Sequence, residues 1–537
     1  MEAVAREPSP SASPFGNYAY AILTAGALRT PDKVALTYCG ERTFTYAELN
    51  GEVNRVAHAL LAAGLTPGTR VASLMNETLH VAEVYLAQMK IGSVVAALNP
   101  YWPADTVAQV VGRSGCTAFV YDATVEEIVR QIRPRLPGVT LWLRVGGPAG
   151  AADDAVDVDA LAAAASAAVP PLGGFGDDLL ALFYTSGTTG LPKAVMHTHF
   201  SSLATAQIWL DVDRDQNSVM GTGAIIWGIG FPALVGPAFY AGMKLVLEQD
   251  WGPANFLRVV SRERVTHVSL IPSFFAALLG SDEHEDADLS SLTSIMLGGE
   301  PLLPSLRERI MKRLPGAAIY SYYGQTEAPY TCFGRQDDGS QHIAAAGRAR
   351  ISCAVRITDP TGRRVIDEVG EINLTGPNVM AGYDKEPERT AEVLRDGWYV
   401  GGDLGVMTAD GFLTVLGRRA DSILKDGQWS QPAQLEQAAT GVDGVAEAGV
   451  VGVPAHPDGQ DAVEQRILVA VVPRAGALLD ADEVRRQLMA RLPVHQHPDL
   501  VVVAADLPHI QDASGGPGKL LRGTISDRYA DRLLPSS

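Results

Sequence analysis

The chain has 537 residues, of which 61 are acidic and 43 are basic, so its formal net charge at pH 7 is −18. Hydrophobic residues make up 47% and charged residues 19%, a globular composition that excludes a chain disordered throughout. The acidic balance argues against broad nucleic-acid binding, which needs clustered lysine and arginine, and the length predicts more than one domain. Only eight of the basic residues are lysines, so a lysine inside a motif is especially informative.

The first part of the chain shows no targeting signal. Residues 1–16 are predicted to be a disordered leader, because they lack the basic start and apolar block of a signal peptide. The four cysteines are scattered, so neither a zinc site nor a disulfide framework is expected. The uncharged stretch 221–243 is long enough to span a membrane, but its six glycines and two prolines favour a buried loop, strand and helix. We therefore expect a cytoplasmic protein without a membrane span.

The first regular element expected is a helix over residues 43–64, where Thr45 and Glu48 form a capping-box pattern and Gly64 ends the helix. Short β-branched runs then alternate with helical patterns, which predicts an α/β fold with buried sheets. Segment 146–178 is expected to be a surface connection that can hold a short helix over 158–168. The predicted strands of this part cover residues 70–74, 92–98, 117–121, 244–247 and 267–271.

From about residue 354 the pattern changes to short strands and turns, which predicts a β-rich subdomain. The overall prediction is an α/β chain with a large N-terminal domain of stacked α/β sheets plus this β-rich subdomain, followed by a small mobile C-terminal α+β domain. We place the large N-terminal domain at 17–417 and the C-terminal domain at 418–537. The C-terminal domain is expected to contain strands over 448–453, 466–472 and 500–503 and a helix over 481–492.

The strongest chemical signal is a loop rich in glycine and hydroxyl residues that follows an apolar strand over 179–183. Its backbone N–H groups and hydroxyls can wrap a polyphosphate, while a lysine adds a point charge. It is not the Walker pattern, because its lysine follows Gly-Leu-Pro. The loop reads Tyr184-Thr185-Ser186-Gly187-Thr188-Thr189-Gly190-Leu191-Pro192-Lys193.

This loop resembles the phosphate loop of the adenylate-forming (ANL) superfamily, which includes acyl-CoA synthetases, luciferases and peptide-synthetase adenylation domains. Other motifs of that family follow in order, and the resemblance covers the chain from about Thr43 to Arg522. It is closest to the branch of acyl- and aryl-acid CoA ligases. The further motifs are Gly298-Gly299-Glu300-Pro301-Leu302, Tyr322-Tyr323-Gly324-Gln325-Thr326-Glu327, Gly370-Glu371-Ile372, Gly376-Pro377, Gly382-Tyr383, Asp396-Gly397-Trp398, Gly402-Asp403-Leu404-Gly405, Gly417-Arg418 and Gly518-Lys519.

The resemblance implies that a carboxylate attacks the α-phosphate of ATP and pyrophosphate leaves. Two anions must meet, so cations and in-line positioning carry most of the catalysis. The ATP-binding residues implied in this way are Thr185, Ser186, Gly187, Thr188, Thr189, Gly190, Lys193, Gly299, Glu300, Pro301, Tyr322, Tyr323, Gly324, Gln325, Thr326, Asp403, Arg418 and Lys519.

Four of the implied residues are catalytic in the family: Lys519, Glu327, Lys193 and Thr188. Lys519 would bridge the carboxylate and the α-phosphate, and two unit charges 4 Å apart interact by about 4 kcal/mol at an effective dielectric of 20. Glu327 would hold Mg²⁺, a hard cation that prefers oxygen ligands.

The nucleoside contacts are also implied by the resemblance. Tyr323 would stack on adenine, and Asp403 would accept hydrogen bonds from the ribose hydroxyls with Arg418 beside it. Taken singly, each of these residues has a plainer structural interpretation, such as a turn cap or a surface ion pair. Their ordered occurrence favours the functional one.

The acyl pocket is expected after Gly221, with Trp227 as the nearest candidate for an aromatic gate residue and Gly298 and Tyr322 lining the same cavity. The neighbouring residues are small or aliphatic, so the pocket is expected to take an apolar acid, even a bulky one. An amino acid would need an acidic partner for its ammonium group, and none is placed convincingly. Trp227 can alternatively be an ordinary core residue.

The hinge and CoA loop depart from the family pattern. Ala420 stands where the family has Asp or Lys, Lys425 is one place later than the usual lysine, and Asp426 precedes Gly427. We therefore expect ATP-dependent adenylation with Mg²⁺, and transfer to CoA that is weak or left to a partner enzyme or carrier protein. Simple drift, with Lys425 compensating, is the alternative for the hinge. A catalytically inactive ATP-binding relative is the alternative for the whole chain.

Overall fold

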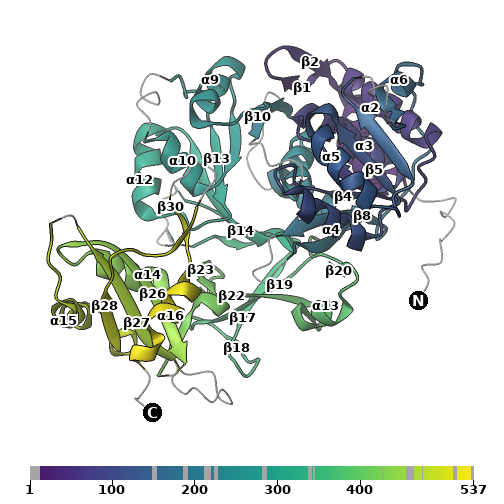
Figure 1. Ribbon diagram of the computed structural model, residues 1–537. Helices are drawn as coiled ribbons and strands as arrows, with labels where there is room; N and C mark the ends of the chain where they lie inside the picture. Colours follow the sequence, from purple (N-terminus) through teal and green to yellow (C-terminus); the bar gives the residue numbers. More distant parts are fainter. Residues whose placement is uncertain are drawn as a thin grey trace. The chain divides into compact units, whose positions relative to one another are not determined.

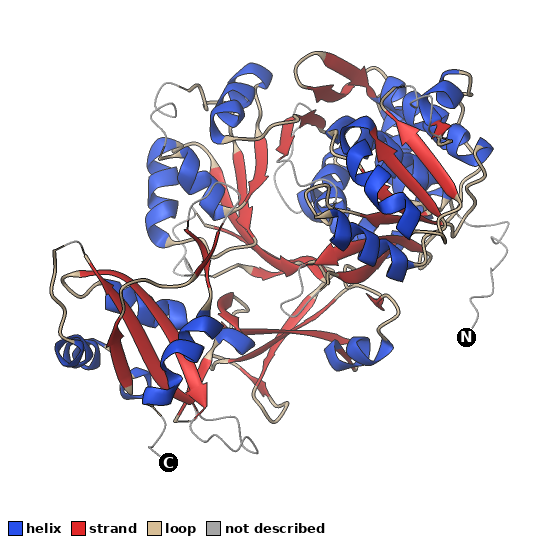
Figure 2. Ribbon diagram, viewed as in Figure 1, coloured by secondary structure: helices blue, strands red, loops and turns tan. Residues whose placement is uncertain are grey.

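The computed structural model describes residues 13–147, 154–185, 191–210, 219–222, 228–280, 287–336, 342, 345–426, 428–454, 465–474, 476–511 and 517–533. Helices and strands are mixed along the chain (Figure 2), and the predicted α/β fold is confirmed. The chain divides into two compact units. The large unit comprises Met1–Arg356, Asn373–Gly401 and Thr408–Thr414, and the small unit comprises Ile357–Ile372, Gly402–Met407 and Val415–Ser537.

The large unit contains an eight-stranded sheet that carries the phosphate-loop motif. Its central strands are parallel, and their β-branched and small residues are buried on both faces, as expected for strands covered by helices. The antiparallel pair β8 and β9 lies towards one edge. In spatial order the strands are β20 (Gly382–Tyr383), β9 (Lys193–Thr198), β8 (Leu179–Thr185), β4 (Val94–Ala97), β3 (Arg70–Leu74), β5 (Ala118–Asp122), β6 (Leu141–Val145) and β7 (Val156–Asp157).

A nine-stranded sheet carries the second group of motifs. The predicted strands 244–247 and 267–271 are confirmed in it as β11 and β12. In spatial order its strands are β16 (Arg348–Ala349), β15 (Ala328–Arg335), β14 (Ala318–Gln325), β13 (Ser294–Gly298), β12 (His267–Leu270), β10 (Val219–Thr222), β11 (Lys244–Leu247), β1 (Val34–Tyr38) and β2 (Arg42–Thr45).

Helices α2 (Tyr46–Ala62) and α3 (Thr78–Ile91) belong to a core that includes side chains of both large sheets. The predicted capping box of α2 is confirmed, with Thr45 and Glu48 exchanging side-chain and backbone hydrogen bonds. Helix α3 has 12 of its 14 residues buried, because a helix packed between layers has no solvent face.

Other helices cover the outer faces of the two sheets (Figure 1). Helices α4 (Ala104–Ser114) and α5 (Glu126–Ile132) pack on the eight-stranded sheet through a second core. Helices α9 (Pro253–Glu263), α10 (Pro272–Leu278) and α12 (Pro304–Arg313) pack beside β12, β13 and β14 through a third. The remaining helices of this unit are α1 (Ala25–Arg29), α6 (Val158–Ala163), α7 (His199–Ala206), α8 (Gly236–Tyr240) and α13 (Pro387–Val393).

The predicted β-rich segment is a six-stranded sheet, and its strands β17, β19, β22 and β23 each run across a boundary between the units. The predicted domain boundary after residue 417 therefore falls within strand β23. The division of the chain into two functional domains at this residue remains a prediction. The strands are β18 (Arg364–Val365), β17 (Ala354–Thr358), β19 (Gly370–Thr375), β22 (Trp398–Met407) and β21 (Leu394–Arg395), with β23 (Leu413–Arg418) paired to β22.

The rest of the small unit packs helices on a three-stranded sheet. Its predicted strands and helix are confirmed with shifts of up to three residues at their ends, because end residues have weaker sequence signals than core positions. Two short hairpins complete it. The elements are β24 (Ile423–Lys425), β25 (Gln428–Ser430), α14 (Pro432–Thr440), β26 (Val445–Pro454), β27 (Gln465–Pro473), α15 (Ala481–Arg491), β28 (Leu500–Val503), β29 (His509–Gln511), β30 (Pro517–Leu520) and α16 (Arg522–Tyr529).

Two expectations from the sequence concern the N-terminal leader and the uncharged stretch that is long enough to span a membrane. Residues 14–16 of the predicted leader form a 3₁₀ turn, whereas residues 1–12 lie outside the described ranges. In the stretch 221–243, the strand β10, a π-helical turn over Phe231–Val235 and helix α8 are found. Within the described ranges, none of the helices combines the length and apolarity that a membrane crossing requires.

Candidate active site

The phosphate-loop motif lies between two paired strands. Strand β8 ends at Thr185 and strand β9 begins at Lys193, and these two residues are direct partners in the antiparallel register. The segment that connects the two strands therefore leaves and re-enters the sheet at paired residues, as a loop that wraps a ligand requires. The predicted residues Ser186, Gly187, Thr188, Thr189 and Gly190 fall outside the described ranges.

Lys193 and Glu327, predicted from separate motifs, lie against the same tyrosine. Strand β20 pairs with β9, so Tyr383 stands beside the start of β9, and Lys193 Nζ lies 5.5 Å from the centroid of its ring. The hydroxyl of Tyr383 donates a 2.8 Å hydrogen bond to Oε1 of Glu327, which is 7% exposed. Burial and the nearby carboxylate raise the pKa of Tyr383, so the hydroxyl keeps its proton. Tyr383 belongs to a motif that was recognised in the sequence, but no sequence pattern predicted its hydrogen bond to Glu327.

A buried histidine ties β9 to the turn that carries Glu327. His197 Nε2 lies 2.7 Å from the carbonyl oxygen of Thr326, and its Nδ1 lies 3.0 Å from the hydroxyl of Ser201. Because a carbonyl only accepts, Nε2 carries the proton and Nδ1 accepts from Ser201. Burial lowers the pKa of His197 to about 4, so the ring is neutral near pH 7. No sequence motif singled out this residue.

The residues present fit a magnesium ion that arrives with a nucleotide better than a metal held by protein alone. Within the described ranges, no group of three or more His, Cys, Asp and Glu residues is placed to hold an ion. Magnesium usually takes one or two carboxylates together with phosphate oxygens and water. Glu327, buried and oriented by Tyr383, is a single carboxylate of this kind.

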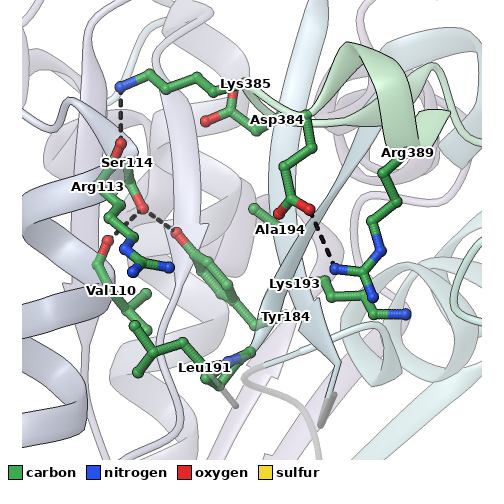
Figure 3. Close-up of a pocket in the computed structure, with 12 residues that line it drawn as sticks. Val110, Arg113, Ser114, Tyr184, Leu191, Lys193, Ala194, Asp384, Lys385 and Arg389 are labelled. Carbon is green, nitrogen blue, oxygen red and sulfur yellow. Dashed lines mark hydrogen bonds and ion pairs between the residues drawn. The ribbon is translucent and has the colours of Figure 1, made fainter. Parts of the chain in front are cut away.

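A polar groove of about 440 Å³ lies beside the start of β9 (Figure 3). Figure 3 shows Lys193 and Arg389 close together on one side of the groove, with Ser114 and Tyr184 on the other. Arg389 lies 5.7 Å from the centroid of the Tyr383 ring and pairs with Glu386 at 3.1 Å. The described residues lining this groove are Val110, Arg113, Ser114, Tyr184, Leu191, Pro192, Lys193, Ala194, Asp384, Lys385, Glu386 and Arg389.

Two ion contacts hold the segment after β20 in place. Asp384 receives both guanidinium nitrogens of Arg70 at 2.8 Å, a bidentate arrangement that fixes orientation. Lys385 Nζ donates to the carbonyl oxygen of Arg113 at 2.7 Å, next to the last turn of α4, where a cation complements the helix dipole. These contacts position Tyr383 from the far side of the groove.

A second, mostly apolar cavity of about 600 Å³ lies along β14. Of the predicted site residues, Gly299, Tyr322, Gly324, Gln325 and Thr326 line it. Tyr323, Glu300 and Pro301 are not among its described lining residues. The lining residues are Tyr101, Ile229, Gly230, Ala233, Leu234, Gln249, Asp250, Trp251, Gly252, Ser269, Leu270, Ile271, Phe274, Gly299, Tyr322, Gly324, Gln325, Thr326, Pro329 and Tyr330.

The predicted pocket residues Gly298 and Tyr322 are neighbours on paired strands. An added Cβ at Gly298 would lie 2.5 Å from ring atoms of Tyr322, so only glycine leaves the ring in its position. The third predicted pocket residue, Trp227, falls outside the described ranges. Ser269 and Tyr330 line the cavity although no motif contains them, and only the pairing of β12, β13, β14 and β15 brings them beside Tyr322.

Glu300 has a structural contact in the large unit. Its carboxylate accepts hydrogen bonds from the backbone N–H and the hydroxyl of Ser273, both at 3.0 Å, in the first turn of α10. A carboxylate at a helix N-terminus satisfies a free N–H and complements the dipole. Pro301, which follows it, is exposed.

In the small unit, Asp403 and Arg418 form an ion pair at 2.9 Å. Asp403 is buried, whereas about half of the Arg418 side chain is exposed. The two predicted ribose-binding residues are therefore adjacent. Lys519 lies in strand β30, which pairs with β29.

The altered hinge segment forms a turn and a tight hairpin. Ala420 lies in the 3₁₀ turn Arg419–Asp421, and Asp426 has φ +53°, the left-handed conformation that favours glycine. Lys425 bonds Oδ2 of Asp499 at 2.7 Å and the carbonyl oxygen of His497 at 2.8 Å. Lys425 is thus held inside the small unit. Gly427 falls outside the described ranges.

Comparison with known proteins places this chain among acid-activating enzymes. The family model described as AMP-binding enzyme matches residues 23–384, and the model of the AMP-binding enzyme C-terminal domain matches residues 434–514. A feruloyl-CoA synthase of Amycolatopsis sp is 32% identical over 509 residues, covering 94% of this chain and 97% of the relative.

Two further similarities cover nearly the whole chain. The fatty acid–[acyl-carrier-protein] ligase ScoC of Streptomyces coeruleorubidus is 29% identical over 510 residues, which cover 91% of this chain and 92% of ScoC. The crystal structure of ATP-bound MatB from Rhodopseudomonas palustris matches with a TM-score of 0.80 and 26% identity, over 97% of this chain and all of MatB.

Proposed function

This chain belongs to the AMP-binding enzyme family, in its branch of acyl- and aryl-CoA ligases, and from that membership we propose how its residues perform the reaction and which acid it takes. The enzyme is an AMP-forming, acid-activating ligase that adenylates a carboxylic acid with ATP. The enzymes of this branch use ATP and CoA. The roles of single residues, the acid and the final acceptor are our proposals.

In the proposed reaction the carboxylate attacks the α-phosphate and pyrophosphate leaves in line with it. The loop from Thr185 to Lys193 holds the departing phosphates, with Thr188 in the loop and the Lys193 ammonium compensating their charge. Lys519 bridges the attacking carboxylate and the α-phosphate. Such groups act by positioning two anions and by offsetting charge where it develops.

Glu327 is proposed to hold Mg²⁺ together with the phosphate oxygens. When bound there, the ion supplies charge neutralisation across the phosphates. The protein's own contribution is orientation: Tyr383 donates to one carboxylate oxygen, and the His197 bond to Thr326 fixes the preceding peptide.

The observation that carries this assignment is the contact of Lys193 and Glu327 with one tyrosine, Tyr383, at the end of the phosphate-loop strands. Two groups predicted from motifs more than 130 residues apart act on the same phosphates in the proposal. Hydroxamate trapping of acyl-AMP and ATP–pyrophosphate exchange with a panel of acids test it. Exchange that survives unchanged in Glu327→Gln and Lys193→Ala would contradict these roles.

The substrate is proposed to be an apolar, aromatic carboxylic acid. The cavity along β14 has aromatic and aliphatic walls, and Asp250 is the one charged side chain among its described lining residues. The Asp250 carboxylate is exposed and accepts from the backbone N–H of Gly252, the residue before α9, at 2.8 Å, so we assign it to this turn rather than to a substrate ammonium. The similarity to a feruloyl-CoA synthase supports the same class of acid.

Transfer to CoA is proposed to be weak, with a partner enzyme or a carrier protein as the physiological acceptor. The reasons are Ala420 at the hinge, Asp426 in a left-handed position, and Lys425 paired with Asp499 inside the small unit. The similarity to a ligase that loads an acyl carrier protein supports a carrier as acceptor. Mass spectrometry of reactions containing CoA tests the idea, and robust acyl-CoA formation by this protein alone would overturn it.

A further inference from the structure

Three hydroxyl groups meet on the wall of the otherwise apolar cavity. Ser269 belongs to β12, Tyr322 to β14 and Tyr330 to β15, and all three line the cavity. The rings of Tyr322 and Tyr330 are 4.7 Å apart in an edge-on arrangement, and Ser269 Oγ lies 3.4 Å from the Tyr330 hydroxyl. Ser269 and Tyr330 are both less than 9% exposed.

The hydrogen-bond donors of this cluster are largely used within the protein. The Tyr330 hydroxyl donates to the carbonyl oxygen of Ala233 at 2.9 Å, so its one proton is engaged and only its lone pairs remain for a ligand. Burial raises the pKa of Tyr322, so its hydroxyl keeps its proton. A hydroxyl has one proton and two lone pairs. The Tyr330 oxygen, whose proton is already used, therefore has acceptor capacity left over.

The contact between Ser269 and Tyr330 leaves space for a further partner. An O–H···O bond is usually about 2.7–2.8 Å long, so the 3.4 Å separation is slack. A ligand hydroxyl that donates to one of these oxygens would satisfy lone pairs that the apolar walls cannot. Buried acceptors without a donor carry a desolvation cost of about 1–3 kcal/mol.

The backbone at Tyr330 has a strained conformation, so contacts from the rest of the fold must stabilise it. Its φ is +49°, a conformation that costs an L-residue about 1–2 kcal/mol. The fully buried Asn378 holds both flanking residues, donating to the Pro329 carbonyl at 2.6 Å and to the Thr331 hydroxyl at 3.1 Å. The strain turns the Tyr330 ring into the cavity wall beside Tyr322.

The cluster lies at a distance from the proposed reaction centre that suits a one-ring acid. Strand β14 carries Tyr322 and ends at Gln325, one residue before Thr326. At about 3.3 Å per residue, the four residues from Tyr322 to Thr326 span about 13 Å at most. Thr326 adjoins Glu327, where the phosphates are proposed to bind. An acid with its carboxylate near Thr326 therefore extends its other end towards the three hydroxyls.

We infer that Ser269, Tyr322 and Tyr330 form a specificity subsite that accepts a hydrogen bond from a phenolic hydroxyl on the ring of an aromatic acid, remote from its carboxylate. This inference rests on the proposed function of the cavity as the acid site. It selects a hydroxylated aromatic acid over the same acid with no ring oxygen. It also selects the hydroxyl over a methoxyl group, because a methoxyl oxygen has no proton to donate.

The test compares 4-hydroxycinnamic, 4-methoxycinnamic and cinnamic acids as substrates of the full-length enzyme, with ATP, Mg²⁺ and hydroxylamine. We expect kcat/KM for the hydroxy acid to exceed that of the other two by about tenfold or more. Ser269→Ala and Tyr330→Phe should each lower this preference, measured as the ratio of kcat/KM for the hydroxy acid to kcat/KM for cinnamic acid, about tenfold. Ser305→Ala, an exposed serine on α12, is the matched control.

Equal kcat/KM for hydroxy and unsubstituted acids, or a preference unchanged in both variants, would overturn the subsite and leave adenylation standing. A methoxy acid used as well as the hydroxy acid would overturn the assignment of the cluster as an acceptor. If none of the three acids yields hydroxamate, calorimetric binding of the same acids in the presence of a non-hydrolysable ATP analogue decides the subsite. Absence of turnover with any acid would instead contradict the proposed function.

Discussion

Tyr383 and Glu327 are joined by a 2.8 Å hydrogen bond although they are 56 residues apart in the chain. The bond joins strand β20 of the eight-stranded sheet to the turn after β14 of the nine-stranded sheet, both inside the large unit. The same ring contacts the phosphate-loop lysine, Lys193. One side chain therefore couples the proposed metal-binding carboxylate to the proposed phosphate-binding cation.

Tyr383→Phe removes this hydrogen bond and keeps the ring. Because a hydrogen bond to a charged group contributes about 1.5–3 kcal/mol, we expect pyrophosphate exchange to fall between about tenfold and a hundredfold. The Mg²⁺ concentration for half-maximal exchange should rise. Exchange assays over a Mg²⁺ titration measure both effects. Tyr240→Phe in α8 is the control, and a Tyr383→Phe enzyme with the wild-type Mg²⁺ dependence would contradict the coupling.

Lys519→Ala should lower pyrophosphate exchange about 10²–10³-fold, because it removes a cation proposed to act only as the two anions meet. ATP binding, measured by calorimetry, should change little. Lys312→Ala, at an exposed position in the last turn of α12, should behave like wild type in both measurements. Exchange that persists in Lys519→Ala would remove this lysine from the catalytic set.

Gly298→Ala should damage the acid site through Tyr322. The new Cβ would lie 2.5 Å from the ring, so the ring must move, and such overpacking costs about 1–3 kcal/mol. We expect KM for the acid to rise more than KM for ATP, together with a lower Tm. Gly112→Ala is the matched control, since its Cβ meets nothing within 4 Å and alanine favours the helix α4. An unchanged KM for the acid would argue against this placement.

Asp426→Gly, alone or with Ala420→Asp, should increase acyl-CoA formation relative to acyl-AMP formation. Glycine fits the left-handed conformation at residue 426 without strain and removes a negative charge from the loop. Stability should be equal to or greater than that of wild type. The ratio of acyl-CoA to acyl-hydroxamate, measured by mass spectrometry, checks this expectation. A ratio that does not change would show that the hinge residues do not limit transfer.

The stability of the enzyme should fall in acid because of buried histidines. Burial lowers the pKa of His199 to about 3, from an ordinary value of 6.5. Between these values the unfolded chain binds a proton that the folded chain does not, so stability decreases as pH falls from about 6.5 towards 3. The loss reaches about 1.4 kcal/mol per pH unit for one such group.

His199→Asn tests this pH dependence. Asparagine can accept the hydrogen bond that Nδ1 of His199 accepts from the backbone N–H of Tyr18, at 3.0 Å, but it does not titrate. Urea unfolding between pH 4 and 7 should show a shallower pH dependence in the variant than in wild type. His197 remains and should account for part of the dependence that is left, since its pKa is lowered to about 4. An identical slope in both proteins would contradict the assignment.

Local signals predicted the elements that depend on neighbouring residues. The capping box of Thr45 and Glu48 marks the start of α2, and the run of apolar residues marks β8, because both patterns lie within a few residues of the element. The motif glycines and the loop around Thr185 and Lys193 were also visible, since a phosphate loop is a contiguous segment. These features needed no knowledge of the fold.

The partners of those residues depended on strand order, which a local pattern does not encode. Tyr383 reaches Glu327 because two different sheets pack against each other, and Ser269 reaches Tyr330 because the strand order brings β12 close to β15 within one sheet. Lys425 illustrates the same limit: its place in the chain pointed to the CoA loop, and the fold pairs it with Asp499, 74 residues away. A functional motif that lies in one contiguous segment can be predicted from the sequence, whereas a site assembled from several strands is decided by tertiary packing.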